Sequence, residues 1–273
     1  MGGDVFVLGA GGMLGHVVSA WLEDCGWKVV QGTARFTGGP DDAMVAEARA
    51  SGCPWVVNCV GRIKQKCADA DELFRVNARL PAQLKTGLDA HQKVIHPSTD
   101  CVFSGRRGWY GVEERPDADD DYGFSKLLGE APAEAGKFFV VRTSIVGPEP
   151  GVGHGLMGWF LRQKGSVNGF TNHYWNGITT LEWAKICHEI MSGKVIGTSI
   201  MQAGVTKRVS KFELLGLFGR FWKLDIPIVP METPSIIDRT LKPEWVRPPL
   251  EVQLSELSCW YGERTAGLNS SQG

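Results

Sequence analysis

The chain has 273 residues, enough for one large domain or for a core domain with a smaller lobe. Its 29 basic and 30 acidic residues give a formal net charge of -1, so we expect no general affinity for nucleic acid or anionic membranes. No apolar segment approaches the roughly 18–20 residues of a membrane span, and the seven cysteines form no Cys-x-x-Cys pair or zinc-like cluster, so we expect a cytoplasmic protein with reduced thiols and no metal site.

The first half of the chain alternates between short apolar runs and helical periodicity. The apolar runs predict strands over residues 5–8, 28–31, 55–60, 94–96 and 138–142. The periodic segments predict helices over residues 14–23, 41–50, 70–91 and 122–130, the third of them broken or restarted at Pro81. This alternation predicts an α/β fold of the Rossmann-like class, with a doubly wound parallel sheet and helices on both faces.

The pattern changes after Gly147, where glycines and prolines cluster. Further helices are predicted over residues 156–164, 181–191 and 211–222, with a strand near residues 196–201. We expect a dinucleotide-binding domain of residues 1–147 plus about 178–203, and a smaller mixed α/β substrate-binding lobe of about 148–177 and 204–262. Residues 263–273 form the predicted tail, and the small polar residues from Thr265 onward are typical of a disordered or appended segment.

A glycine-rich loop lies between the first strand and the first helix. Gly9, Gly12 and Gly15 give the spacing G-x-x-G-x-x-G in the context that a dinucleotide fingerprint requires. The amides and the positive end of the following helix would then hold a pyrophosphate. A glycine-rich turn without a ligand is the alternative.

The residues after the second strand bear on the choice of cofactor. A dinucleotide fold that prefers NAD usually has an acidic residue there, which binds the ribose 2′-hydroxyl. This chain has Gly32-Thr33-Ala34-Arg35, and Arg35 could pair with a 2′-phosphate. The sequence therefore favours NADP(H), with NAD(H) as the second choice; a solvated surface arginine is the alternative for Arg35.

Tyr122 and Lys126 are four residues apart, so on a helix they share one face. A neighbouring ammonium favours the ionised form of a phenol, which brings its proton closer to transfer at neutral pH. Thr99 follows the fourth predicted strand, and ligands of open α/β sheets bind at the carboxyl ends of strands. Its hydroxyl could therefore bond a substrate oxygen, or it is an ordinary turn hydroxyl.

In order and spacing, these motifs resemble the extended short-chain dehydrogenase/reductases, and among them the dTDP-4-dehydrorhamnose reductase group of sugar-nucleotide reductases. The motifs are Gly9/Gly12/Gly15, Asn58-Cys59-Val60-Gly61, the run from Ser98 to Phe103, Tyr122 with Lys126, and Arg142-Thr143-Ser144. The resemblance covers about residues 3–262 and is strongest up to Gly147. It is more specific for the superfamily than for the sugar.

The resemblance implies NADPH-dependent reduction of the C4 ketone of a nucleotide-activated 4-keto-6-deoxy sugar, for surface polysaccharide synthesis. Tyr122 would donate a proton to the carbonyl oxygen, and Thr99 would hydrogen-bond that oxygen. Lys126 would hold the nicotinamide ribose and lower the pKa of the tyrosine. The implied cofactor site comprises Gly9, Gly12, Met13, Leu14, Gly15, Arg35, Asn58, Cys59, Val60, Gly61, Asn77, Ser98 and Lys126.

Cys101 departs from the pattern, because the family usually has a tyrosine at this position. In related GDP-fucose synthases, a cysteine here acts with a histidine of the second lobe as an epimerisation pair, and His154 falls near the matching place. A combined C3/C5 epimerase/4-reductase is therefore one alternative. The other is that Cys101 lines the pocket and His154 caps or precedes a helix. Dehydration is not expected, because dehydratases of this superfamily carry Thr-Asp-Glu at this strand end.

Candidate substrate contacts in the second lobe are Asn172, Trp175 and Arg239. The segment 168–180 mixes aromatics with amides, which could stack a base or line a sugar pocket, whereas Trp175 could equally be a core residue. Arg239 could meet the substrate diphosphate or form a surface ion pair. A non-catalytic NADP-binding regulatory subunit, as found in the same family, is a further alternative. The sequence does not determine the oligomeric state, and a homodimer is one possibility.

Overall fold

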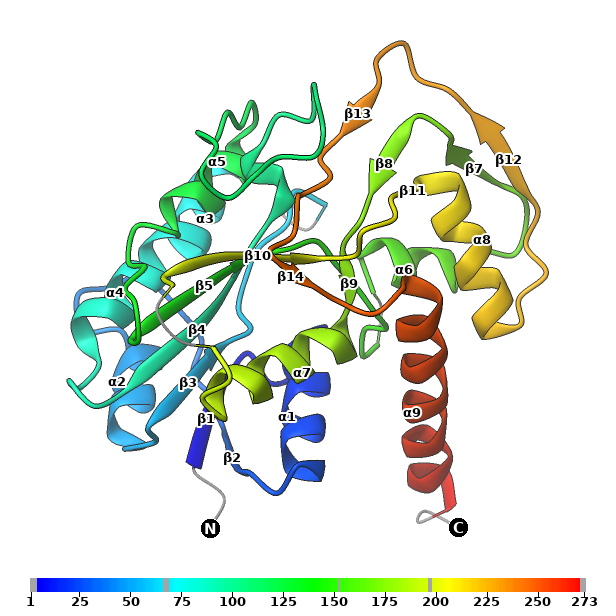
Figure 1. The fold of residues 1–273 in the computed structure, drawn as a ribbon. Coiled ribbons are helices and arrows are strands. Elements are labelled where there is room, and N and C mark those ends of the chain that lie inside the picture. The colour runs from blue at the N-terminus through cyan, green and yellow to red at the C-terminus, as the bar shows by residue number, and fades with distance from the viewer. Residues whose placement is uncertain (1–3, 66–68, 152, 196–197, 271–273) are drawn as a thin grey trace.

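The computed structural model describes residues 4–65, 69–151, 153–195 and 198–270. Its centre is a seven-stranded parallel sheet with the strand order β14-β10-β5-β4-β3-β1-β2 (Figure 1). The strands are β1 (Asp4–Leu8), β2 (Lys28–Gln31), β3 (Trp55–Asn58), β4 (Lys93–Ser98), β5 (Phe138–Arg142), β10 (Ile200–Gly204) and β14 (Trp245–Val246). The predicted Rossmann-like parallel sheet is confirmed.

Helices cover both faces of this sheet (Figure 1). One face carries α1 (Gly15–Asp24) and α7 (Thr180–Met191); the other carries α2 (Ala43–Ala50), α3 (Ala70–Phe74), the π-helical turn η1 (Arg75–Arg79), α4 (Leu80–Gly87) and α5 (Asp121–Leu128). Successive side chains of a strand point to opposite faces. In β1, Val5 and Val7 accordingly join the core under α1 and α7, while Phe6 and Leu8 join the core under α2 and α4.

A second set of elements, which we call the accessory group, lies beside the carboxyl ends of the strands (Figure 1). It comprises α6 (Leu156–Phe160), β7 (Val167–Phe170), β8 (His173–Trp175), β11 (Val209–Ser210), α8 (Lys211–Trp222), β12 (Ile228–Met231) and β13 (Ile237–Asp238). Strand β8 pairs with β11 and β13, and β7 pairs with β12. The group has its own core, which includes Phe160, Leu214 and Phe218. The short strands β6 (Ile145–Val146) and β9 (Ile178–Thr179) pair at its junction with the sheet.

Helix α8 has the predicted bounds, because local sequence determines both of its ends. Ser210 and Glu213 form a capping box at its start, and Lys223 ends it in the left-handed conformation. The helix predicted over residues 70–91, with a break or restart at Pro81, is divided into α3, η1 and α4 and ends at Gly87. Pro81 stands in the first turn of α4, where its missing N–H is tolerated.

The prediction of a disordered tail is wrong for residues 265–270, because helix α9 (Leu250–Ser270) continues through them. Residues 271–273, and residues 196–197 of the strand predicted over 196–201, lie outside the described residues. Helix α9 is anchored in two cores: Leu250 and Leu254 pack with the accessory group, and Leu257 packs with α1 and α7. No helix in the described part of the chain combines the length and the apolar character needed to span a membrane.

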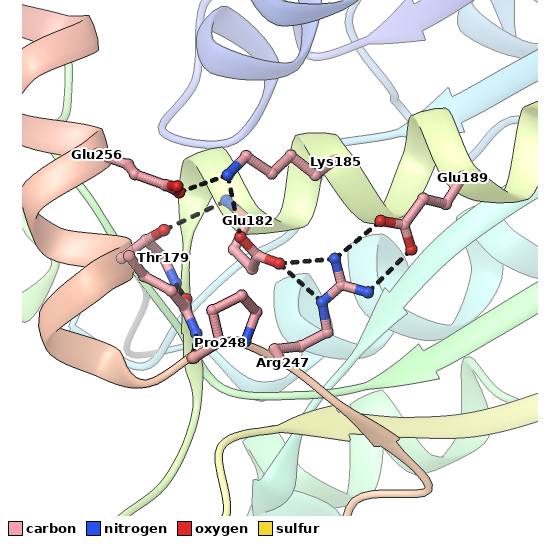
Figure 2. A network of polar contacts seen from close by, with 8 residues as sticks. Thr179, Glu182, Lys185, Glu189, Arg247, Pro248 and Glu256 are labelled. Carbon is pink, nitrogen blue, oxygen red and sulfur yellow. Dashed lines mark hydrogen bonds and ion pairs between the residues drawn. The ribbon is translucent and has the colours of Figure 1, made fainter.

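Arg247 ties the start of α9 to α7 (Figure 2). Its guanidinium lies 2.6 Å from Glu182 Oε1 and donates to both carboxylate oxygens of Glu189, at 2.9 and 3.0 Å. The arginine is 9% exposed and Glu182 1%, so water screens this pair poorly. Lys185, on the same helix, pairs with Glu256 of α9 at 2.5 Å.

We predict that Arg247→Met will lower the free energy of unfolding by about 3–5 kcal/mol, because the buried carboxylate of Glu182 loses its guanidinium partner and keeps only Lys185 at 3.5 Å. Urea denaturation followed by circular dichroism would measure the change. Arg115→Met removes an exposed arginine and is the matched control. An unchanged midpoint for Arg247→Met would contradict the assigned role.

Candidate active site

A cleft of about 890 Å³ opens at the carboxyl ends of the sheet strands. One wall comes from the loops after β1, β3 and β4, at residues 12–14, 59–65 and 97–101. The opposite wall comes from the accessory group, including Trp175 and Lys211. Strand ends of open α/β sheets are the usual ligand sites of such folds. The cleft therefore lies where the sequence places its candidate residues.

The glycine loop joins β1 to α1 at one end of the cleft. Gly9 has φ +70°, and a Cβ there would lie 2.9 Å from Val60 Cγ2. A Cβ on Gly15 would collide with the carbonyl oxygen of Gly9. Packing thus requires glycine at these two positions, while residues 12–14 line the cleft. The amide of Gly12 donates to the Gly9 carbonyl at 2.9 Å and closes the turn.

The loop after β3 is shaped by Asn58, which is fully buried. Its Nδ2 lies 2.9 Å from His96 Nδ1, and its Oδ1 accepts from the amide of Val60 at 3.0 Å. Residues Cys59, Val60 and Gly61 line the cleft. Asn58 therefore supports this loop from beneath, and is not part of the lining.

Asn77 connects the same loop to helix α5. It lies on the π-helical turn, a feature often found at functional sites. Its Nδ2 donates to the carbonyl of Arg62 at 2.9 Å and to Ser125 Oγ at 3.0 Å, and its Oδ1 accepts from the Arg62 amide at 2.9 Å. Ser125 Oγ in turn donates to the carbonyl oxygen of Tyr122 at 2.8 Å. One amide therefore fixes a cleft wall against the helix that carries the tyrosine.

Three candidate residues meet at the end of β4. Thr99 begins a 3-10 turn, η2 (Asp100–Val102), where its Oγ1 accepts from the Cys101 amide at 3.2 Å and donates to Asp100 Oδ1 at 3.0 Å. Burial raises the pKa of the Tyr122 phenol, and the neighbouring Thr99 side chain lowers it. Burial raises the pKa of the Cys101 thiol to about 12. The structure thus brings Thr99, Cys101 and Tyr122 together.

Burial dominates the protonation of Tyr122 and Lys126. It raises the pKa of Tyr122 well above the usual value for a phenol, and it lowers the pKa of Lys126 to about 8. The ammonium of Lys126 donates to the carbonyl oxygen of Pro97 at 2.6 Å. The expected lowering of the Tyr122 pKa by Lys126 is not found in this structure, where burial is the largest cause of the shift and raises the pKa.

A buried ion pair lies beneath Lys126. Glu130 accepts two hydrogen bonds from Arg142, at 2.9 and 2.8 Å, and one from Ser98 Oγ at 2.5 Å. The charge of Glu130 also raises the pKa of Lys126, against the larger effect of burial. Ser98 lines the cleft, but its hydroxyl is committed to Glu130.

Comparison with known proteins assigns the chain to a family. A family profile described as the RmlD substrate binding domain matches residues 3–169, more than half of the chain. The chain belongs to this RmlD family. Among curated proteins, a sequence search finds no significant match.

Solved structures with a similar fold include several sugar-nucleotide enzymes. The dTDP-4-dehydrorhamnose reductase of Bacillus anthracis, in complex with NADP, is 18% identical with a TM-score of 0.80, over 95% of this chain and 100% of that one. The structure of MoeE5 in complex with UDP-glucuronic acid and NAD is 15% identical with a TM-score of 0.73, over 96% and 100%. WbmG of Bordetella bronchiseptica, in complex with NAD and UDP, is 14% identical with a TM-score of 0.72, over 97% and 96%. At these identities the likeness shows a shared fold.

In this RmlD-family chain, two of the predicted substrate residues of the second half line the cleft. Trp175 is 2% exposed, so it is a core residue that also forms part of the wall. His154 is exposed at the cleft, on the segment before α6. Trp175 is therefore a core residue, and its contact with a substrate stays a prediction.

Three other predicted residues lie outside the cleft as the described residues define it. Asn172 donates to the carbonyl of Thr233 at 2.8 Å and holds the loop before β13. Arg239 donates to the carbonyl of Phe103 at 2.9 Å, so its guanidinium holds two loops together. Arg35 is exposed, four residues past the end of β2.

The sequence reasoning missed several parts of the lining, among them Lys211 and the loop after β5. Lys211 was assigned to the start of a helix, without a role in the cleft. Residues 143–147 and Glu149 line it from the loop after β5, where Glu149 accepts from the amide of Gly155 at 2.7 Å. The available signal was positional, because the sequence had already placed ligand residues in the loops after β1, β2, β3 and β4.

We predict that Gly15→Ala will lower the free energy of unfolding by about 1–3 kcal/mol, because its Cβ has no room beside the Gly9 carbonyl. Gly11→Ala is the matched control, since a Cβ there would meet nothing within 4 Å. Urea titrations of the two variants would measure the difference. Equal stabilities would show that the loop and α1 are not closely packed.

Proposed function

We propose that this RmlD-family protein is an NADPH-dependent reductase of the C4 ketone of a nucleotide-activated 4-keto-6-deoxy sugar, serving surface polysaccharide synthesis. The observation that carries the proposal is the meeting of Thr99, Tyr122 and Lys126 in one large cleft. Family membership supports the sugar-nucleotide substrate, as do the similar structures of dTDP-4-dehydrorhamnose reductase with NADP and of MoeE5 with UDP-glucuronic acid and NAD.

The residues present fit a dinucleotide. The glycine loop leaves space over Gly11, and residues 12–14 face the cleft at the start of α1, where amides favour a pyrophosphate. The nicotinamide end would be held by Lys126 and by the segment from Cys59 to Gly61. Arg35, exposed past β2, would pair with a 2′-phosphate and favour NADP(H) over NAD(H). When bound, the cofactor supplies a hydride.

The side chains of this chain then provide the proton and the electrostatic stabilisation. Tyr122, kept protonated by burial, would donate its proton to the carbonyl oxygen of the substrate. The Thr99 hydroxyl, which donates to Asp100 Oδ1 in this structure, would turn to donate to the same oxygen and position it. The charge of Lys126 would stabilise the negative charge that develops there.

Two alternatives are less well supported by the same geometry. An epimerising pair needs a base at neutral pH, whereas burial raises the pKa of Cys101 to about 12, and its proposed partner His154 is exposed. A purely regulatory subunit would have no need for Thr99, Tyr122 and Lys126 to meet. The geometry therefore favours the simple reductase.

We predict that Tyr122→Phe will lower kcat about 100- to 10,000-fold, because the proton donor is lost while the ring remains. The assay follows oxidation of NADPH, and separately of NADH, with a dTDP- or UDP-4-keto-6-deoxy sugar. Tyr261→Phe, on α9, is the matched control. Full activity of Tyr122→Phe would exclude the mechanism, and faster oxidation of NADH would exclude the choice of NADPH.

We predict that NADPH affinity will weaken as the pH rises through about 8, where Lys126 loses its charge. Fluorescence titration across pH 6–10 would measure Kd. Lys126→Met should bind more weakly and lack this alkaline change. The same change in both proteins would show that another group titrates.

A further inference from the structure

The accessory group contributes the cation of Lys211 to the cleft. The proposed mechanism does not use this residue. It is the first residue of α8 and follows β11, whose pairing with β8 sets Ser210 opposite Tyr174. This register places Lys211 beside His173, and both residues line the cleft. The ammonium lies 5.6 Å from the ring centroid of Trp175, a distance at which the ring attracts a cation.

The ammonium of Lys211 has no hydrogen-bond or ion-pair partner among the residues that the structure describes, although its side chain is half-buried. The other cations of the cleft are engaged: Arg62 with Glu72, Lys64 with Asp120, Lys126 with the Pro97 carbonyl, and Arg162 with the Gly153 carbonyl. Leaving a charge partly desolvated and unpaired is costly. Lys211 is therefore poised to bind a group that enters the cleft.

Asp100 lies on the opposite wall of the cleft. Its Oδ1 accepts from Thr99 Oγ1 at 3.0 Å and from Cys101 Sγ at 3.5 Å. Asp100 and Lys211 form no ion pair within 4 Å, but both line the cleft, one from each wall. Burial lowers the pKa of Lys211, and the Asp100 carboxylate raises it. The carboxylate and the ammonium therefore border the same space from opposite walls, with Thr99 beside the carboxylate.

We propose that Lys211 and Asp100 together bind one hydroxyl group of the substrate's sugar ring, beside the reacting carbonyl. This inference rests on the proposed function. A hydroxyl group is both acceptor and donor, so it can take a hydrogen bond from the ammonium and give one to the carboxylate. A diphosphate would satisfy Lys211 but would be repelled by Asp100. The pair therefore recognises a neutral, hydroxylated sugar, and Trp175 supplies an apolar surface beside it.

The test measures the contribution of the sugar separately from that of the nucleotide. Isothermal titration gives Kd for dTDP and dTDP-glucose, and for UDP and UDP-glucose, with the NADP-loaded protein. Lys211→Met should raise the Kd of the tightest-binding glucose conjugate by roughly 10- to 100-fold, which is the effect of losing one charged hydrogen bond. The same variant should leave the corresponding nucleoside diphosphate unchanged. Lys207→Met, an exposed lysine of the β10–β11 loop, is the matched control.

A second variant, Asp100→Asn, keeps the side-chain volume and tests the other half of the pair. It should weaken binding of the glucose conjugate only. The double variant should lose little more affinity than either single variant, because both residues bind the same hydroxyl group. This arm also decides the question if Lys211→Met does not fold.

If Lys211→Met lowers the affinity for the nucleoside diphosphate as much as the affinity for its glucose conjugate, the proposal is overturned, since the lysine would then bind phosphate. Unchanged affinity for both would overturn it as well. Both results leave the reductase proposal intact, provided that the wild-type protein binds nucleotide sugars. Failure of the wild-type protein to bind any of them would instead contradict the proposed function.

Discussion

The active-site geometry depends on the hydrogen bond from Lys126 to the Pro97 carbonyl, which holds α5 against the end of β4. Helix α5 can pack closely against its surroundings because Gly123, in the helix, and Gly129, at its end, carry no side chain. A Cβ on Gly123 would collide with the carbonyl oxygen at Cys101, and one on Gly129 with that of Asn77. The tyrosine of α5 is therefore positioned by backbone packing as well as by side-chain contacts. Such preorganisation reduces the entropic cost of aligning a proton donor with its substrate.

The two walls of the cleft belong to different hydrophobic cores, so its width depends on how the accessory group is joined to the sheet. Helix α9 spans the junction, with Leu254 in one core and Leu257 in the other. Arg247 adds a polar connection, since it binds two carboxylates of α7 immediately before α9 begins (Figure 2). The strands β6 and β9 provide a third connection. The position of Lys211 relative to Asp100 is thus set by contacts far from either residue.

Local sequence was sufficient for the features that local physics determines. Strand alternation predicted the sheet, the capping box at Ser210 accounts for the bounds of α8, and the spacing of Tyr122 and Lys126 predicted their shared helix face. Features that depend on distant partners were missed. Strand β14 has only two residues and exists because it pairs with β10, and Arg239 is held by the carbonyl of Phe103, 136 residues away. The exposure of Lys211 to the cleft arises in the same way, from the pairing of β11 with β8.

The effect of burial on Tyr122 bears on the direction of the proposed reaction. A phenol with a raised pKa stays protonated at neutral pH, which is the state a proton donor needs in reduction. The alkoxide formed by hydride transfer is a much stronger base than phenolate, so proton transfer to it remains favourable. Oxidation of an alcohol needs the opposite state, a phenolate, and burial makes that state costly. Burial of the phenol therefore keeps Tyr122 in the protonated state that the proposed reduction requires.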